Sequence, residues 1–176
     1  MGLWQRATEL LFGTFSLLLM RLPPLLSPVR PRLTVAAVIE NDGRFLFVEE
    51  RDGQGRSVIN QPAGHVEGGE SLLEALVRET VEETGFGVEP LFLVGAYLWT
   101  TPDGSRSYLR MAIAAKALSH DADRPLDEGI ERALWLSREE LVAETDRHRS
   151  PLVLRCVDDY LFGECYPLTL MKSLTD

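Results

Sequence analysis

The sequence changes its hydrophobic period at Ser71, and this change restricts the fold more than any other local feature. Ser71 followed three residues later by Glu74 is the pattern of a capping box, in which both side chains satisfy free amides at a helix start. Apolar side chains then recur at helical spacing: Leu72, Leu73, Leu76, Val77 and Val81. Gly85 is placed to end this helix, because glycine readily adopts the left-handed conformation that follows a last turn.

Runs typical of β-strands flank this helix on both sides. The expected strands are Leu33–Ile39, Arg44–Glu49, Leu91–Thr100 and Tyr108–Ala117, with a further strand at Arg132–Leu136. The turn Asn41-Asp42-Gly43 joins the first two strands, since these residue types tolerate positive φ. Two further helices are expected at Ser137–Ala143 and Pro151–Leu161. This mixed order predicts an α/β or α+β domain rather than a helical bundle or a β-sandwich.

The first 32 residues differ from the rest of the chain, because they hold four arginines against one glutamate. Within them, Leu10–Met20 is apolar but shorter than the roughly 20 residues that span a bilayer as a helix. Three interpretations stay open: an extension upstream of a true start at Met20, an amphipathic helix that docks on the domain or on a membrane surface, or an export signal. Several prolines then predict an extended tether, which sets the expected domain at residues 33–172.

The net charge of −9 argues against nucleic acid or an anionic membrane as partner, because both require a basic face. The two cysteines, Cys156 and Cys165, form no CxxC pair, and His65, His120 and His148 are scattered. Neither a disulfide framework nor a structural zinc site is therefore expected. A reducing cytoplasm is the expected compartment.

An acidic cluster lies on the predicted helix. Glu79, Glu82 and Glu83 stand at i, i+3 and i+4, which places three carboxylates on one helix face. The segment from Gly64 to Phe86 holds six glutamates and one arginine. Such a cluster is either a solvated acidic face or a set of hard oxygen ligands for Mg²⁺ or Mn²⁺, ions that commonly bridge to substrate phosphates.

The complete string favours the second interpretation. It reads G-x5-E-x7-R-E-x-x-E-E-x-G-Φ, with its specified residues at Gly64, Glu70, Arg78, Glu79, Glu82, Glu83, Gly85 and Phe86. This string resembles the Nudix box in every charged and glycine position. Thr80 is the one departure, since the family usually has an aliphatic residue there. The capped helix after a glycine-rich loop is the context that the motif requires.

The resemblance implies an αβα sandwich with a mixed central β-sheet and a Mg²⁺-dependent hydrolase, with Mn²⁺ as a substitute ion. Carried over by position, Glu79, Glu82 and Glu83 would bind the metal, and a carbonyl of Ala63 or Gly64 would be a further ligand. Glu79 would also orient or deprotonate the attacking water. A carboxylate beside an activated water is enough for this chemistry, so no covalent nucleophile is needed.

Three further residues take roles from the same resemblance. Arg78 would hold the glutamates in place by ion pairing, and Glu70 would be a supporting carboxylate. Many Nudix enzymes supply one more acid from the segment that resembles Asp127–Ile130 here, and Glu128 is the candidate for that metal ligand.

A narrower resemblance covers about residues 33–170. Gln61–Glu67, Ser150–Val153 and Tyr166–Leu168 look like the NudJ-type phosphatases of bacteria, a group within the same family. This resemblance implies release of orthophosphate from nucleoside tri- and diphosphates and activity on a thiamin-precursor pyrimidine pyrophosphate. Gln61 and His65 border the glycine-rich loop and are the candidates for substrate contact.

Two other functions stay open. The chain could be a Nudix pyrophosphohydrolase of another nucleoside diphosphate derivative, such as ADP-ribose, or a non-catalytic module that binds a nucleotide. The intact set of glutamates argues against the module. In each case the expected partner is a small-molecule nucleotide or pyrophosphate, and the chain is expected to be a monomer or a homodimer. Three aromatic residues either stack a base or belong to the core: Tyr97, Trp99 and Tyr108.

Overall fold

The computed structural model describes residues 29–174, and the chain from Pro31 onwards clusters as one compact unit. The strands are β1 (Arg32–Asn41), β2 (Arg44–Arg51), β3 (Ser57–Asn60), β4 (Ala63–His65), β5 (Phe86–Thr100), β6 (Ser107–His120) and β7 (Ile130–Ser137). The helices are α2 (Leu72–Thr84), α3 (Arg138–Ala143) and α4 (Leu152–Phe162), with short 3₁₀ turns at Thr145–Arg147 and Leu168–Leu170.

The interpretations of the N-terminal segment concern residues outside this described part, and the domain bounds 33–172 stay a prediction. Between residues 29 and 174, no helix combines the length and the apolar content that a membrane crossing requires.

The seven strands form one mixed sheet, in which five follow the order β3-β2-β1-β6-β5, while β4 pairs with β1 and β7 pairs with β2. Strands β1 and β6 are parallel, and every other strand pair is antiparallel. Strands β1 and β2 pair only beside their hairpin, at Asn41 with Arg44 and at Glu40 with Phe45. Further along the same edge β1 pairs with β4 instead, so the short strand that carries Gly64 lies directly beside β1.

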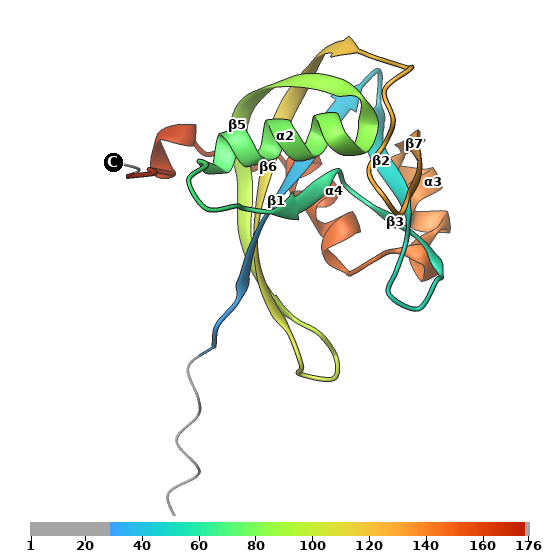
Figure 1. Ribbon diagram of the computed structural model, residues 1–176, viewed down its shortest axis with the longest axis horizontal. Coiled ribbons are helices and arrows are strands. Elements are labelled where there is room, and N and C mark those ends of the chain that lie inside the picture. Colours follow the sequence, from blue (N-terminus) through green and yellow to red (C-terminus); the bar gives the residue numbers. More distant parts are fainter. Residues whose placement is uncertain (1–28, 175–176) are drawn as a thin grey trace, which may run out of the picture. The chain divides into compact units, whose positions relative to one another are not determined.

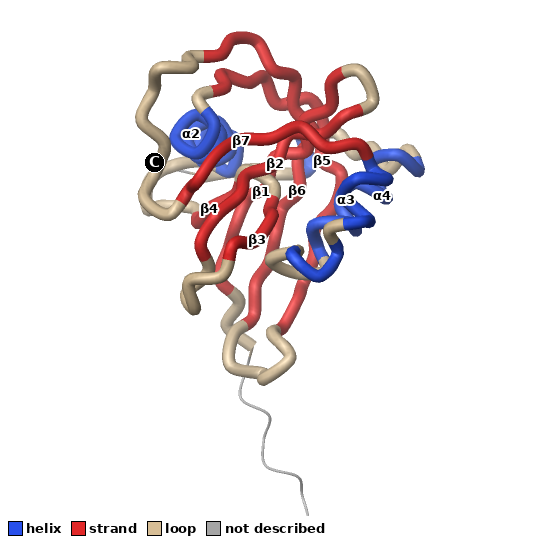
Figure 2. Tube along the Cα trace, turned by 90° about the vertical axis from the view of Figure 1, so that its right-hand side faces the viewer, coloured by secondary structure: helices blue, strands red, loops and turns tan. Residues whose placement is uncertain are grey.

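Helices cover both faces of this sheet. Successive residues of a strand point to opposite faces, so one strand can feed two cores. Val35 and Ile39 of β1 belong to the core under α2, whereas Val38 belongs to the core under α4. Figures 1 and 2 show α2 on one side of the strands and α3 and α4 on the other. The predicted αβα sandwich with a mixed central sheet is confirmed.

Local signals placed the first hairpin and the ends of α2 correctly. Asp42 and Gly43 both have positive φ, 51° and 77°, as the two central residues of this hairpin turn require. Both hydrogen bonds of the predicted capping box are present between Ser71 and Glu74. Gly85 ends α2 in the left-handed conformation with φ of 72°.

The buried face of α2 is more polar than the predicted apolar stripe. Its buried residues are Ala75, Leu76, Thr80, Glu83 and Thr84. Of the predicted apolar stripe, Leu76 is fully buried, and Leu72, Leu73 and Val77 are half-buried against the same core. The last turn faces β4 and places Glu83 inside. Thr80, the departure from the family pattern, satisfies its hydroxyl by donating to the Leu76 carbonyl over 2.7 Å.

Two strands had no sequence prediction, and a third begins earlier than expected. Strands β3 and β4 are only four and three residues long, too short to show a period. Strand β5 starts at Phe86 rather than at Leu91, because the chain passes from Gly85 directly into the sheet. Pro90 lies inside β5, where an edge strand tolerates the missing amide donor and the register shifts.

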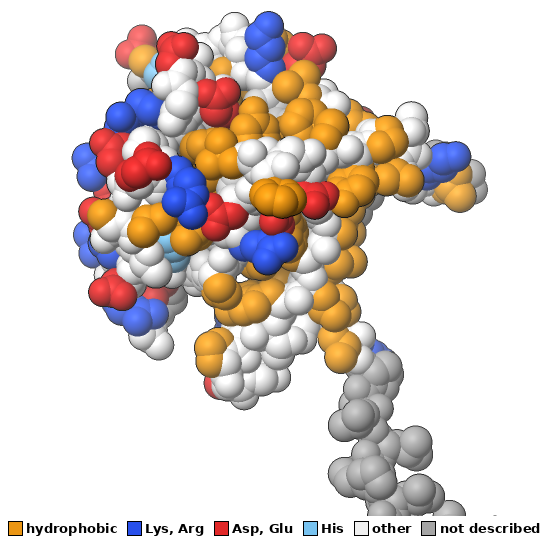
Figure 3. Space-filling model, turned by 180° about the vertical axis from the view of Figure 1, so that it is seen from behind, with side chains coloured by type: hydrophobic (Ala, Val, Ile, Leu, Met, Phe, Trp, Pro, Cys, Tyr) orange, Lys and Arg blue, Asp and Glu red, His pale blue; other side chains and the backbone are white. Residues whose placement is uncertain are grey.

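Charged and apolar surface are unevenly distributed. Several large apolar side chains stay exposed on β5 and near the C-terminal end: Leu91, Leu98, Tyr166 and Leu170. Figure 3 shows the side opposite to Figure 1, where hydrophobic side chains form a broad area beside interleaved acidic and basic side chains.

Candidate active site

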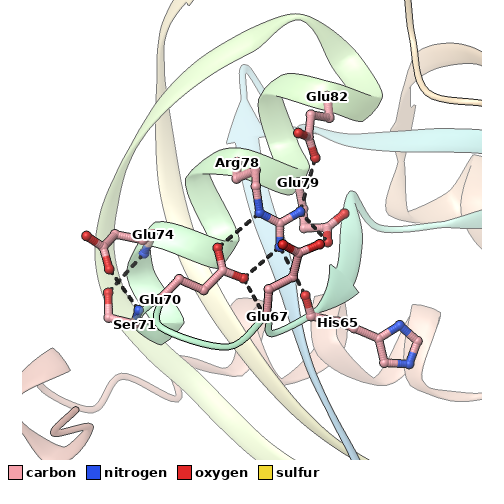
Figure 4. Close-up of polar contacts among 8 residues, drawn as sticks. All are labelled: His65, Glu67, Glu70, Ser71, Glu74, Arg78, Glu79 and Glu82. Carbon is pink, nitrogen blue, oxygen red and sulfur yellow. Dashed lines mark hydrogen bonds and ion pairs between the residues drawn. The ribbon is translucent and has the colours of Figure 1, made fainter. Parts of the chain in front are cut away.

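One arginine of α2 holds three glutamates. The Arg78 guanidinium donates to both carboxylate oxygens of Glu70 at 2.7 and 3.0 Å, to Glu79 at 2.8 Å and to Glu82 at 3.1 Å. It also donates to the backbone carbonyl of His65 over 3.1 Å. Figure 4 shows these side chains converging on the guanidinium from the helix and from the loop before it. The neighbouring carboxylates raise the pKa of Arg78 and keep it charged.

The third acid of the predicted face is buried against β4. Glu83 is 9% exposed and accepts a 2.8 Å hydrogen bond from the backbone N–H of Ala63. Burial raises the pKa of Glu83 to about 8, and the nearby acids Glu50, Glu79 and Asp127 add to the shift. Burial also raises the pKa of Glu79, against the opposing effect of Arg78. The positive charge near these two carboxylates is therefore too small to offset the cost of burying them in ionised form.

Gly64 faces the same glutamates. A Cβ built on Gly64 would lie 1.9 Å from Cδ of Glu79 and 2.0 and 2.1 Å from its two oxygens. Its φ is not positive, so the glycine is required by close approach and not by a turn. Strand β4 and the glutamate face of α2 thus meet at Gly64 and Ala63.

The donor set has the chemistry that a hard divalent cation prefers. Glu79, Glu82 and Glu83 offer only oxygen ligands, and their charge exceeds that of Arg78. Between residues 29 and 174, no three ligand-type side chains surround one common point, because Glu79 and Glu82 both turn toward Arg78. A cation would have to compete with Arg78 for these two carboxylates.

The residue next to the predicted Glu128 is linked to this cluster. Asp127 donates its backbone N–H to the Glu82 carbonyl over 3.1 Å, and its charge raises the pKa of both Glu79 and Glu83. Asp127 and Glu128 are both exposed, and of the two only Asp127 is among the main causes of the raised pKa values of Glu79 and Glu83. The role of Glu128 as a further metal ligand stays a prediction.

The two predicted substrate contacts differ in position. His65 lies at the end of β4, and Figure 4 shows its ring pointing away from the glutamates. His65 lines a cleft with a volume of about 630 Å³. Gln61 is 1% exposed, donates to the Val153 carbonyl over 2.7 Å and accepts from Arg110 over 3.2 Å. Gln61 therefore reaches the cleft through Arg110.

The same cleft contains charged residues that no sequence pattern had indicated, together with two of the aromatic residues named above. Arg110 is 8% exposed, and Glu50 pairs with Arg149 over 3.2 Å. A charged residue inside the apolar run of β6 was the available signal for Arg110. Trp99 and Tyr108 also line the cleft, whereas Tyr97 donates to Asp159 on α4.

The fold and this arrangement of glutamates are those of a known class. The sequence model of the NUDIX domain family matches residues 30–156, and the chain belongs to the Nudix hydrolases, enzymes that act on phosphoanhydride bonds. Among curated relatives, Phosphatase NudJ of Escherichia coli (strain K12) is 37% identical over 142 residues, which cover 81% of this chain and 91% of that protein. Phosphatase NudJ of Shigella flexneri matches equally well.

Solved structures agree with this assignment. A Nudix hydrolase from Nitrosomonas europaea is 44% identical, has a TM-score of 0.81 and covers 83% of this chain and 99% of its own. A UDP-X diphosphatase structure is 20% identical with a TM-score of 0.63, covering 86% of this chain and 72% of its own, and shows the shared fold alone.

Proposed function

We propose that this chain is a Mg²⁺-dependent phosphatase that releases orthophosphate from nucleoside tri- and diphosphates. The observation that carries the proposal is a pair of carboxylates, Glu79 and Glu83, that lack enough neighbouring positive charge. Both are packed against the β4 backbone at Ala63 and Gly64. The name of the curated relatives, Phosphatase NudJ, supports the same reaction class. A thiamin-precursor pyrimidine pyrophosphate is a further proposed substrate.

The proposed ligand set for Mg²⁺ is Glu79, Glu82, Glu83 and a backbone carbonyl of Ala63 or Gly64, with Mn²⁺ as a substitute ion. When bound, the cation supplies charge neutralisation for the phosphate chain and makes water more acidic. Glu128 is the proposed additional acid, and the neighbouring Asp127, whose charge raises the pKa of Glu79 and Glu83, is a second candidate for that place.

The side chains of Glu79, Arg78 and Glu70 have different roles in the proposed reaction. Water attacks the terminal phosphorus, the bond from phosphorus to the bridging oxygen breaks, and Glu79 accepts the proton of the water. The raised pKa of Glu79 suits it to this task. Arg78 fixes the orientation of Glu79 and Glu82, and Glu70 anchors Arg78 with two hydrogen bonds. Arg78 and Glu70 are therefore positioning residues.

The cellular setting is part of the proposal. Cys156 and Cys165 are both free thiols, which fits a reducing cytoplasm. The proposed partner is a small-molecule nucleotide or pyrophosphate, with neither nucleic acid nor membrane involved, and the chain is proposed to act as a monomer or homodimer.

A product assay tests the reaction. The full chain is incubated with GTP, GDP, ADP-ribose and a thiamin-pathway pyrophosphate, in Mg²⁺ or in EDTA, and orthophosphate is measured before and after added pyrophosphatase. We expect direct orthophosphate release from GTP and GDP that EDTA abolishes. Glu83→Gln should lower the rate at least roughly 100-fold, whereas Glu89→Gln, an exposed acid on β5, should not change it.

Other outcomes would replace the proposal. Phosphate that appears only after pyrophosphatase means cleavage between the α- and β-phosphates. Production of AMP from ADP-ribose, without turnover of GTP, identifies a pyrophosphohydrolase of a different nucleoside diphosphate derivative. Nucleotide binding without any turnover in Mg²⁺ identifies a non-catalytic module.

A further inference from the structure

The cleft beside β4 carries an excess of positive charge in an acidic chain. Four arginines line it, against the two acids Glu50 and Asp52: Arg56, Arg106, Arg110 and Arg149. Arg56 pairs with Asp52 and Arg149 pairs with Glu50. Within residues 29–174, neither Arg106 nor Arg110 forms an ion pair. Two positive charges therefore remain for an anionic ligand.

Arg110 is a buried cation that only neutral groups contact. Its guanidinium donates to Oε1 of Gln61 at 3.2 Å and to Oδ1 of Asn60 at 3.3 Å, and it is 8% exposed. Burial lowers its pKa, against the opposing effects of the Cys156 thiol, Glu50 and Glu83. A guanidinium has five N–H donors, so donors remain for an acceptor in the cleft. A buried charge without a counter-charge is costly and is usually compensated by a ligand or a partner.

Two hydroxyl groups in the same cleft have no hydrogen-bond partner among the described residues. The side chains of Thr34 and Ser150 are each 7% exposed, and both hydroxyl oxygens are buried without a partner. Thr34 of β1 is the direct register partner of Arg110 on β6. Ser150 comes two residues before the start of α4. Buried hydroxyls normally find a partner, so these two indicate a polar ligand atom at Arg110.

Two aromatic side chains, Trp99 and Tyr108, form what we call the aromatic wall, which lies further from the glutamates than Arg110 does. Tyr108 stands two residues before Arg110 on β6 and pairs with Trp99 on β5. Their ring centroids are 5.9 Å apart with an angle of 23° between the planes, and both residues line the cleft. Such a pair offers a flat apolar surface to a third ring.

The strand register sets the order of these features. Ala63, whose N–H holds Glu83, pairs with Ala36 of β1, and Arg110 pairs with Thr34 two residues earlier. Tyr108 pairs with Arg32, another two residues earlier. Two residues along a strand span about 7 Å. The glutamates, the buried arginine and the aromatic wall therefore follow one another along the sheet.

We propose that this cleft binds the part of the substrate that the glutamates do not hold. Arg110 and the hydroxyls of Thr34 and Ser150 bind a phosphate oxygen of the group that remains after cleavage, and Trp99 with Tyr108 packs against an aromatic ring. The order of the substrate along the cleft rests on the proposed function. The binding of an aromatic phosphate ester to these residues does not, and it can be measured without metal or turnover.

Calorimetric titration of the full chain with GDP, guanosine and inorganic pyrophosphate in EDTA tests the site. We expect Arg110→Met to weaken GDP binding at least roughly tenfold, because it removes charge-assisted hydrogen bonds, and to leave the weaker guanosine affinity unchanged. Trp99→Leu should weaken GDP and guanosine but not pyrophosphate. Arg124→Met is the charge-matched control, since Arg124 lies in an exposed loop outside the cleft, and it should bind all three ligands as the parent chain does.

Thr34→Val separates a ligand contact from a structural role. If the hydroxyl awaits a ligand, its removal weakens GDP binding about threefold and does not lower the melting temperature. A lower melting temperature with unchanged GDP binding would overturn the assignment of Thr34. Equal GDP affinity in Arg110→Met and Arg124→Met would overturn the whole site.

The two proposals fail in different ways. In Mg²⁺, Arg110→Met should raise the KM for GTP more than it lowers kcat. If the chain hydrolyses GTP, but neither the KM for GTP nor the affinity for GDP changes in Arg110→Met, the proposed phosphatase activity stands and the proposed binding cleft is rejected. Binding of GDP that depends on Arg110, without turnover of any substrate, keeps the cleft and rejects the phosphatase.

Discussion

The glutamate face of α2 and the cleft beside β4 are neighbouring regions with opposite charge imbalances. On α2, one guanidinium serves Glu70, Glu79 and Glu82, and burial raises the pKa of Glu83. In the cleft, burial lowers the pKa of Arg110, whose guanidinium donates to the amide oxygens of Gln61 and Asn60 and lies beside the Cys156 thiol. Burial disfavours the charged form in both places, with opposite signs. A metal ion together with a phosphate chain would correct both imbalances at once.

This difference also separates what each region does for the folded protein. Neither region is optimised for stability, because each leaves a buried charge without sufficient compensation. A substitution that removes an uncompensated group should therefore stabilise the ligand-free protein and impair binding or activity. A substitution that removes a group with satisfied hydrogen bonds should instead destabilise the protein and leave ligand binding unchanged. The following predictions test that distinction.

The largest expected effect is a pH dependence of stability that originates in Glu83. The folded state holds this proton up to a pH of about 8, whereas the ordinary value of such a carboxyl group is 4.5. The folded state therefore binds more protons between these values, and the stability of the metal-free protein should fall as pH rises through this window, by roughly 4 kcal/mol in total. Urea unfolding in EDTA at several pH values between 4.5 and 8 measures it.

Two comparisons make this test specific. Glu83→Gln should flatten the slope, whereas Glu89→Gln should retain it. Added Mg²⁺ should stabilise the parent chain more at pH 8 than at pH 5, because the carboxyl must lose its proton to bind a cation. A slope that survives Glu83→Gln would assign the effect to other groups.

The next effect concerns the contact between β4 and α2. An alanine at position 64 would overlap the Glu79 carboxylate, which is the flexible end of a side chain and can move. Gly64→Ala should therefore lower kcat about 100-fold by displacing Glu79, with little loss of melting temperature. Gly85→Ala is the opposite case, because Gly85 has φ of 72° and its Cβ would lie 2.4 Å from the Asp121 carbonyl oxygen. This variant should lose stability first; equal behaviour of the two variants would contradict the assignment.

The ion-pair network around Arg78 should have a smaller effect. Arg78→Gln removes the partner of three carboxylates, and because the Arg78 side chain is 26% exposed we expect a loss of about 2 kcal/mol in unfolding free energy. Mg²⁺ should restore more of the melting temperature in this variant than in the parent chain, because Glu79 and Glu82 are released. Arg138→Gln, which breaks an exposed pair with Asp158, should cost less than about 1 kcal/mol. Equal losses in both variants would show that the network adds nothing.

The glutamate region could be predicted from the sequence because its information is local. The capping box at Ser71, the spacing of Glu79, Glu82 and Glu83, and Gly85 all lie within one helix and its ends. Helical geometry alone places such residues on neighbouring turns. The role of Glu128 stays a prediction, since a loop that approaches from elsewhere has no period to fix its side chains.

The cleft could not be predicted in the same way, because the pairing of distant strands assembles it. Thr34, Arg110 and Ser150 come from β1, β6 and the segment before α4, and no spacing in the sequence links them. Gln61 was selected for its place beside the glycine-rich loop, and its amide is buried between Arg110 and Val153. Its role as a substrate contact stays a prediction, whereas the structure supports a positioning role through Arg110.

Two threonine substitutions give the smallest and most discriminating effects. Thr80 and Thr34 are both buried, but the hydroxyl of Thr80 donates to the Leu76 carbonyl and that of Thr34 has no partner. Thr80→Val should therefore destabilise the protein by about 0.5–1 kcal/mol without changing KM, whereas Thr34→Val should be neutral or stabilising by a similar amount. Chemical denaturation of both variants in EDTA measures the difference. If the two valines shift stability in the same direction, the hydroxyl of Thr34 is satisfied in solution and the contrast between the two regions fails at this position.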